Sequence, residues 1–197
     1  RSVAVILQRA SSTKAGNELT EVQLLEALRR KDPTGTRAFY DRYVGYLTAV
    51  ALRYVPDQSA VKDILQDAFI RMIDAADRFE YRGEGCLKSW ACRIVVNGAL
   101  KTLRGQGKLQ YVEDLPDVPE EEDVPVQKVP AAMLQRMIQE LPDGYRTVFN
   151  LYVFEKKSHR EIAGLLGIKE DSSASQFFRA RAQLARQIKA YLKEHER

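Results

Sequence analysis

The sequence predicts an all-α protein: two small helical domains joined by an extended acidic linker, the second domain containing a helix-turn-helix. Three observations support this prediction. Apolar residues recur at three- and four-residue spacing along most of the 197 residues, as expected for helices with one buried face. Alternating runs typical of strands are no longer than a few residues. Residues 111–129 hold seven acidic side chains against one basic, and prolines interrupt them, which favours an extended linker.

Four helices are expected before the linker. Thr20 and Gln23 form a capping-box pattern at the start of the first helix. Ser59 is the expected cap of the third helix. A glycine-bearing loop, Tyr81 to Gly85, separates the third helix from the fourth. The expected helices run, in order, from Thr20 to about Asp32, over 34–54, from Ser59 to about Ala76, and from Leu87 to Leu103.

Helical pattern resumes after the linker at Ala131, and Pro142-Asp143 begins another helix. We therefore expect a flexible N-terminal extension and two helical domains separated by the linker. Their boundaries are expected at 1–17 for the extension, 18–105 for the first domain, 106–130 for the linker and 131–197 for the second domain.

Composition excludes several classes of protein. No apolar run approaches the roughly 20 residues of a membrane span, so we expect no membrane insertion. Two cysteines, Cys86 and Cys92, are too few for a disulfide framework, and their spacing does not match a metal site. We expect a soluble protein of the cytoplasm with no metal and no cofactor.

The net charge of +4 hides a basic, acidic, basic arrangement. Residues 81–110 hold six basic and one acidic residue, and residues 156–197 hold ten basic and five acidic residues. Both basic segments suit phosphate binding, which releases counterions and gives sequence-independent affinity. The alternative for each segment alone is an ordinary solvated helix face.

Residues 158–181 have the layout of a helix-turn-helix, with the small Ala163 and, four residues later, Gly167 at the turn. In this motif the second helix places its N-terminal side chains in the major groove of DNA. That helix is expected to begin near Ser172. The polar residues expected on its exposed face are Ser172, Ser175, Gln176 and Arg179. The alternative is an ordinary helical hairpin.

Aromatic and basic residues are interleaved over 79–104. Tyr81 and Trp90 flank the glycine-bearing loop, and four polar residues recur on one helix: Arg93, Asn97, Lys101 and Arg104. An aromatic surface beside basic side chains is what an unpaired or flipped base requires. The alternative is that Trp90 is a core residue and the basic stripe is a solvated face.

Asp63, Gln66 and Asp67 share one face of the third helix at i, i+3 and i+4. Paired acids serve acid–base catalysis, but no His or Cys lies near them in the sequence, and the chain contains no glycine-rich phosphate loop. We therefore predict that the chain is not an enzyme.

Taken together, these segments resemble the extracytoplasmic-function sigma factors, small two-domain initiation factors of bacterial RNA polymerase. The resemblance covers residues 20–192 and is carried in order by D63-ILQD-A-F69, Y81RGEG-LKSW90-RI-VN97-AL, L141PDGYR-VF-LY and the helix-turn-helix ending in F178RARAQL184. It implies a first domain that binds core RNA polymerase and melts the −10 promoter element. It implies a second domain that reads the −35 element, and an anti-sigma factor is a possible further partner of the family.

The resemblance also implies roles for individual residues. The residues expected to bind core polymerase are Asp63, Gln66, Asp67 and Ile70. Those expected to contact the melted −10 strand are Tyr81, Arg82, Glu84, Lys88, Trp90, Arg93, Asn97, Lys101 and Arg104. Those expected to contact the −35 element are Ser172, Ala174, Ser175, Gln176, Phe178 and Arg179. The rival hypothesis is a stand-alone helix-turn-helix regulator, which accounts for 131–192 but not for the aromatic–basic loop or the acidic linker.

Overall fold

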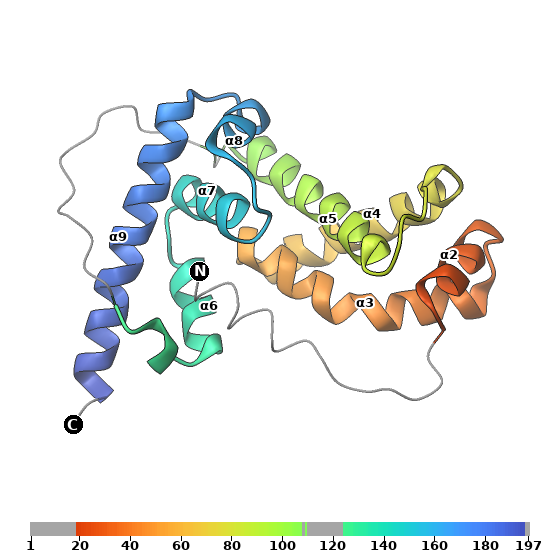
Figure 1. Ribbon diagram of the computed structural model, residues 1–197, viewed down its shortest axis with the longest axis horizontal. Coiled ribbons are helices and arrows are strands. Elements are labelled where there is room, and N and C mark those ends of the chain that lie inside the picture. Colours follow the sequence, from red (N-terminus) through yellow and green to blue (C-terminus); the bar gives the residue numbers. More distant parts are fainter. Residues whose placement is uncertain (1–18, 108, 110–123, 196–197) are drawn as a thin grey trace. The chain divides into compact units, whose positions relative to one another are not determined.

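The computed structural model describes residues 19–107, 109 and 124–195. This part of the chain contains α-helices and short 3-10 helices and no strand, so the predicted all-α class is confirmed (Figure 1). It falls into two compact units, one ending at Gln106 and the other beginning at Gly107. The seven acidic residues of the predicted linker, like the predicted extension 1–17, lie outside the described residues.

The first unit follows the predicted order of helices, and side chains define where each begins. Thr20 and Gln23 form the expected capping box. Asp32 accepts the Gly35 N–H at the start of the second helix. Asp57, and not Ser59 as predicted, caps the third helix, because its carboxylate accepts two backbone N–H groups. The elements are α2 (Glu21–Arg29), α3 (Pro33–Tyr54), α4 (Gln58–Ala75), the 3-10 helix η2 (Ala76–Arg78) and α5 (Cys86–Gly105).

The core of the first unit lies among α2, α3, α4 and α5. Phe39 on α3 packs edge-on against Phe69 on α4, with ring centroids 5.9 Å apart. Gly98 on α5 lets that helix approach Ile64 closely, since a Cβ at Gly98 would lie 3.3 Å from an Ile64 methyl carbon. The apolar side chains buried here include Leu24, Leu28, Leu47, Met72, Leu87 and Leu100.

The second unit begins earlier than predicted. Val129 is buried, and Val124 and Val126 pack against the same apolar cluster, so 124–130 is packed rather than an extended linker. The cluster is built mainly from α6, α7 and α9. The elements are η3 (Val126–Lys128), α6 (Ala131–Gln139), α7 (Asp143–Val153), α8 (His159–Leu166) and α9 (Glu170–His195).

Arg146 fixes the turn between α6 and α7. Its guanidinium is almost fully buried and donates to the carbonyls of Gln139 and Leu141 at 2.9 and 2.7 Å, and it pairs with Asp143. Burial lowers the pKa of Arg146, and the carboxylate of Asp143 partly offsets that effect. The charge is therefore held in place by hydrogen bonds to carbonyls at the end of α6.

Both ends of α8, the first helix of the helix-turn-helix, are fixed by local residues. Ser158 and Glu161 form a capping box at the start of α8. The hydrogen bonds that Glu161 accepts from Lys157 and Ser158 lower its pKa to about 2. Gly167 ends α8 with φ 71°, a left-handed conformation that favours glycine. The next helix begins at Glu170, two residues before the predicted start.

Candidate nucleic-acid interface

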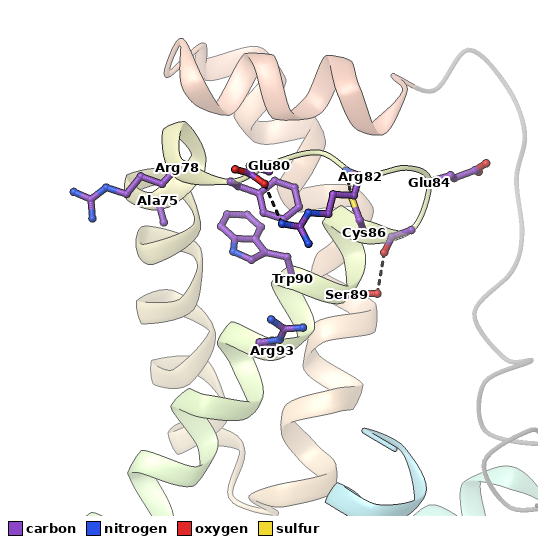
Figure 2. Close-up of a pocket in the computed structure, with 11 residues that line it drawn as sticks. Ala75, Arg78, Glu80, Arg82, Glu84, Cys86, Ser89, Trp90 and Arg93 are labelled. Carbon is purple, nitrogen blue, oxygen red and sulfur yellow. Dashed lines mark hydrogen bonds and ion pairs between the residues drawn. The ribbon is translucent and has the colours of Figure 1, made fainter. Parts of the chain in front are cut away.

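An open cavity of about 800 Å³ lies beside the loop of the first unit (Figure 2). One wall is formed by the indole of Trp90, which stacks on the Phe79 ring with centroids 4.6 Å apart and an angle of 29° between the planes. Trp90 is half-buried, so it is both packed and accessible. The lining residues are Ala75, Arg78, Phe79, Glu80, Arg82, Glu84, Gly85, Cys86, Ser89, Trp90 and Arg93.

Two glycines with positive φ shape the loop, Gly83 at 127° and Gly85 at 83°, conformations that L side chains rarely adopt. The Arg82 guanidinium pairs with Glu80 at 3.0 Å, and the Arg82 backbone N–H donates to the Cys86 thiol at 3.4 Å. In Figure 2 the Arg82 side chain lies over the cavity beside Trp90, whereas Arg78 and Glu84 point away from it. A positive group and an aromatic face therefore meet at one opening.

Tyr81 is exposed at the loop but does not line the cavity. Desolvation, and then the negative charge of Glu21, raise the pKa of Tyr81, so its hydroxyl stays protonated at neutral pH. The loop thus presents a neutral aromatic ring outside the cavity and a second one, Trp90, inside it.

The predicted basic stripe on α5 is exposed along its whole length. Arg93, Asn97, Lys101 and Arg104 are all exposed and follow one another by four, four and three residues, which places them on one helix face. Lys88 does not belong to this stripe: its ammonium lies 4.1 Å from the centre of the Tyr46 ring, a cation–π contact within the unit. The predicted contact of Lys88 with the −10 strand stays a prediction.

The acidic face predicted on α4 is also exposed. Asp63, Gln66 and Asp67 are accessible, and Ile70 on the same helix has 51% of its surface exposed. Asp63 and Asp67 line a groove of about 200 Å³ between α4 and α5, together with Arg71 and Lys101. The acids of α4 and the stripe of α5 therefore border one another.

The exposed face of α9 near its start is more apolar than predicted. Ala174 and Phe178 are exposed, four residues apart, whereas Ser172, Ser175 and Arg179 are half-buried. Ser175 donates its hydroxyl proton to the Asp171 carbonyl of its own helix. Arg179 donates to the Tyr145 hydroxyl of α7 at 3.1 Å. Of the residues predicted to read the −35 element, Ala174 and Phe178 present the most open surface.

Gln176 contradicts the prediction that it lies on the exposed face. It has only 3% of its surface exposed, and neither amide atom has a hydrogen-bond partner among the described residues. The reason is helical phase: Gln176 lies three residues after Ser173 and four before Ala180, and all three are buried. Leu165 on α8 is also exposed.

A contact between α8 and α9 was not predicted. Ser173, at a position where an apolar residue was expected, is fully buried, and its hydroxyl lies 3.0 Å from Nδ1 of His159. The His159 ring stacks on Tyr152 with centroids 4.7 Å apart, and Tyr152 in turn contacts Phe177. His159 looked isolated in the sequence because its partners lie on α7 and α9.

No group of three or more His, Cys, Asp or Glu side chains in the described part of the chain could hold a metal ion. None of the described helices combines the length and apolar character needed to cross a membrane.

Two family models match the chain in the order of its units. The model of Sigma-70 region 2 matches residues 39–109, which includes the loop, the cavity and the stripe on α5. The model of Sigma-70 region 4 matches residues 131–184, which includes the helix-turn-helix. A solved structure of CnrH in complex with the cytosolic domain of CnrY aligns with a TM-score of 0.46 at 20% identity, covering 85% of this chain and 96% of that one.

Curated relatives span nearly the whole chain. The RNA polymerase sigma-H factor of Pseudomonas aeruginosa is 26% identical over 186 residues, covering 87% of this chain and 95% of the relative. The ECF RNA polymerase sigma-E factor of Escherichia coli is 26% identical over 190 residues, covering 89% and 98%. That of Haemophilus influenzae is 26% identical over 185 residues, covering 87% and 96%. The chain therefore belongs to the extracytoplasmic-function group of RNA polymerase sigma factors.

Proposed function

We propose that this chain is an alternative sigma factor that binds core RNA polymerase, recognises the −35 and −10 elements of its promoters and starts transcription by melting the −10 element. The observation that carries the proposal is the ordered match of both sigma regions to two units with separate candidate DNA surfaces. A stand-alone helix-turn-helix regulator would need only the second of these units.

In this proposal the first unit holds the melted −10 strand. An unpaired base stacks on Trp90 in the cavity, and Arg82 lies at its edge. Arg93, Lys101 and Arg104 then contact the phosphates of the same strand. The stacking contact exists only after the duplex opens, so it stabilises the melted state over the closed one.

The second unit reads the duplex −35 element through the start of α9, and Ala174 and Phe178 supply apolar contacts in the major groove. Asp63, Gln66, Asp67 and Ile70 on α4 form the surface for core polymerase. This role assigns no catalytic residue to the chain, because the polymerase forms the phosphodiester bonds. We infer that the protein acts in the cytoplasm, where polymerase and promoter DNA lie.

Transcription in vitro tests the first half of the proposal. With core polymerase and promoter DNA selected on the wild-type protein, Trp90→Ala should reduce open-complex formation by about tenfold or more, because base stacking is worth about 1–3 kcal/mol. Trp90→Phe keeps an aromatic face and is the matched control. Closed-complex binding should be unchanged. Equal losses of duplex binding and melting, with a lower melting temperature of the protein, would show that Trp90 acts only as a core residue.

A pull-down titration with core polymerase tests the second half. The double variant Asp63→Ala, Asp67→Ala should lose affinity, because removing desolvated charges at an interface costs about 2–5 kcal/mol. Asp74→Ala, an exposed acid farther along the same helix, is the control. Unchanged affinity of the double variant would remove this face of α4 from the polymerase interface.

A further inference from the structure

Helix α2 contacts both ends of the loop that borders the cavity, although α2 lies more than 45 residues earlier in the sequence. We propose that α2 is a positioning element for this loop, with Arg29 holding the start of the loop and Glu21 holding its end. The inference rests on the proposed function of the cavity as the site of a −10 base. It adds two residues that themselves need not contact DNA.

Arg29 holds the start of the loop through its planar guanidinium. Its Nε donates to the Ala76 carbonyl at 3.2 Å and its Nη2 to the Phe79 carbonyl at 2.8 Å. The remaining Nη1 pairs with Glu26 on the preceding turn of α2 at 2.8 Å. Because a guanidinium directs its donors in one plane, these bonds fix where the backbone of Phe79 lies. The Phe79 ring carries the stack with Trp90.

Glu21 holds the end of the loop. Its Oε2 accepts the backbone N–H of Gly85 at 2.9 Å, and its Oε1 accepts the hydroxyl of Tyr43 at 3.0 Å. The carboxylate is buried, with 7% of the residue exposed. Burial, followed by the charge and hydrogen bond of Glu21, raises the pKa of Tyr43, so Tyr43 keeps its proton and remains a donor. Gly85 is the residue from which α5 starts, so this bond also locates that helix end.

Between the backbone groups that are bonded to Arg29 and to Glu21, the loop contacts mainly itself. Glu80, Arg82 and Glu84 are exposed, and the bonds of Arg82 run to Glu80 and Cys86, within or next to the loop. By contrast, α2 is anchored through Leu24 and Leu28, which are buried in the core. The core therefore sets the separation of the two loop ends through α2, and with it the opening beside Trp90. In Figure 2 the ribbon of α2 runs across the top of the view, above the loop.

The alternative is that these bonds only stabilise α2. Thr20→Ala separates the two readings, because it removes the capping box of α2 without touching the loop. Capping bonds of this kind stabilise the first turn of a helix, so this variant weakens α2 by itself. Glu21→Ala removes the loop hold. Glu21→Gln restores it, since the amide oxygen accepts from Gly85 and the amide nitrogen donates to Tyr43.

Hydrogen exchange of the full chain, without DNA, measures directly how strongly Glu21 and Arg29 restrain the loop. We expect Glu21→Ala to accelerate exchange of the hydrogen-bonded loop amides of Phe79, Gly85 and Cys86 by about tenfold or more, with Glu21→Gln close to wild type. Thr20→Ala should accelerate exchange at the start of α2 and leave residues 79–86 unchanged. Arg29→Ala should accelerate exchange over the same loop, and it provides a second test if Glu21→Ala does not fold.

Binding of the holoenzyme to DNA measures how the position of the loop affects recognition of the −10 segment. The probe is a fork-junction DNA with a duplex −35 element and a single-stranded −10 segment, selected on the wild-type holoenzyme. Glu21→Ala should weaken binding of this probe by about tenfold, which corresponds to the loss of one hydrogen bond to a charged group. Binding of duplex DNA that carries only the −35 element should stay within about twofold.

Two results would overturn the inference: loop exchange in Glu21→Ala and Arg29→Ala equal to wild type, or, where Trp90→Ala does weaken fork binding, equal effects of Glu21→Ala and Thr20→Ala on that binding. Failure of the proposed function gives a different pattern, because Trp90→Ala would then leave fork binding intact. The exchange experiment decides the positioning role of α2 in either case.

Discussion

Gln176 offers the sharpest test of the helix-turn-helix, because sequence and structure place it on opposite faces of α9. Its side chain has 3% of its surface exposed, and both amide atoms lack hydrogen-bond partners among the described residues. A buried polar group without a partner costs about 1–3 kcal/mol. We therefore expect that replacing it by an apolar residue of similar size stabilises the second unit.

Methionine is the appropriate replacement. It matches glutamine closely in length and in helix propensity, and it packs in irregular spaces. Part of the gain is lost to imperfect repacking, so we expect Gln176→Met to raise the free energy of unfolding by about 1–2 kcal/mol. For a unit of this size, each kcal/mol raises the melting temperature by about 4–8 °C. Gln183→Met, at a half-buried position on the same helix, should change stability by only a few tenths of a kcal/mol.

Calorimetry of the full chain measures the change in stability, and binding selections on random duplexes measure the base preference at the −35 element. The base preference at the −35 element should be the same for Gln176→Met and the wild type, because the side chain does not reach the surface. A lowered melting temperature, or a changed preference at one base position, would refute the reasoning. The first result would mean that the amide is hydrogen-bonded in solution, and the second that it faces the groove.

Three other predictions follow from single contacts. Arg146→Met should lower the free energy of unfolding of the second unit by about 3–5 kcal/mol, because it removes the buried donor to the Gln139 and Leu141 carbonyls. Urea titration measures this change, and Arg136→Met, at an exposed position, is the control. The pKa of Glu161 is lowered from 4.5 to about 2, so its contribution to stability is present above about pH 4.5 and is lost as the pH falls through about 2; melting temperatures between pH 6 and 2 should show a smaller acid dependence for Glu161→Gln than for the wild type. Phe178→Ala should weaken the base preference at one −35 position, by less than the roughly 1–3 kcal/mol of a bidentate side-chain–base pair; binding selections measure this, and Leu165→Ala, which removes another exposed apolar side chain, should leave every base preference unchanged.

Local patterns in the sequence predicted most helices of the described part, because the periodicity of buried residues and the caps are local. The capping box of Thr20, the left-handed Gly167 and the glycine-bearing loop are all as expected. Segment 124–130 was misjudged because its prolines continue those of the acidic linker, whereas its three valines pack on the second unit.

The errors at the candidate site arise from phase and from distance. Residues 172–176 are mostly small and polar, so no hydrophobic pattern fixes which of them face inward. An error of one residue in assigning the inward positions turns the predicted exposed face by about 100° around the helix. The contacts that Lys88 and Glu21 make were missed for another reason. Their partners Tyr46 and Gly85 lie 42 and 64 residues away, and nothing in a single sequence relates such positions.

These corrections change how the second unit must read DNA. With Gln176 buried and Arg179 bonded to Tyr145, the start of α9 offers few free side chains for bidentate hydrogen bonds to bases. What it does offer is the Ala174 methyl and the Phe178 ring, four residues apart on one exposed face. In the major groove, apolar groups recognise the thymine methyl rather than a donor or acceptor pattern. Such contacts are worth less than a bidentate pair, so affinity must come largely from phosphate contacts, which vary with salt and not with sequence. We therefore predict that discrimination between promoters depends more on the cavity beside Trp90 and Arg82, the proposed site of the unpaired −10 base, than on the −35 helix.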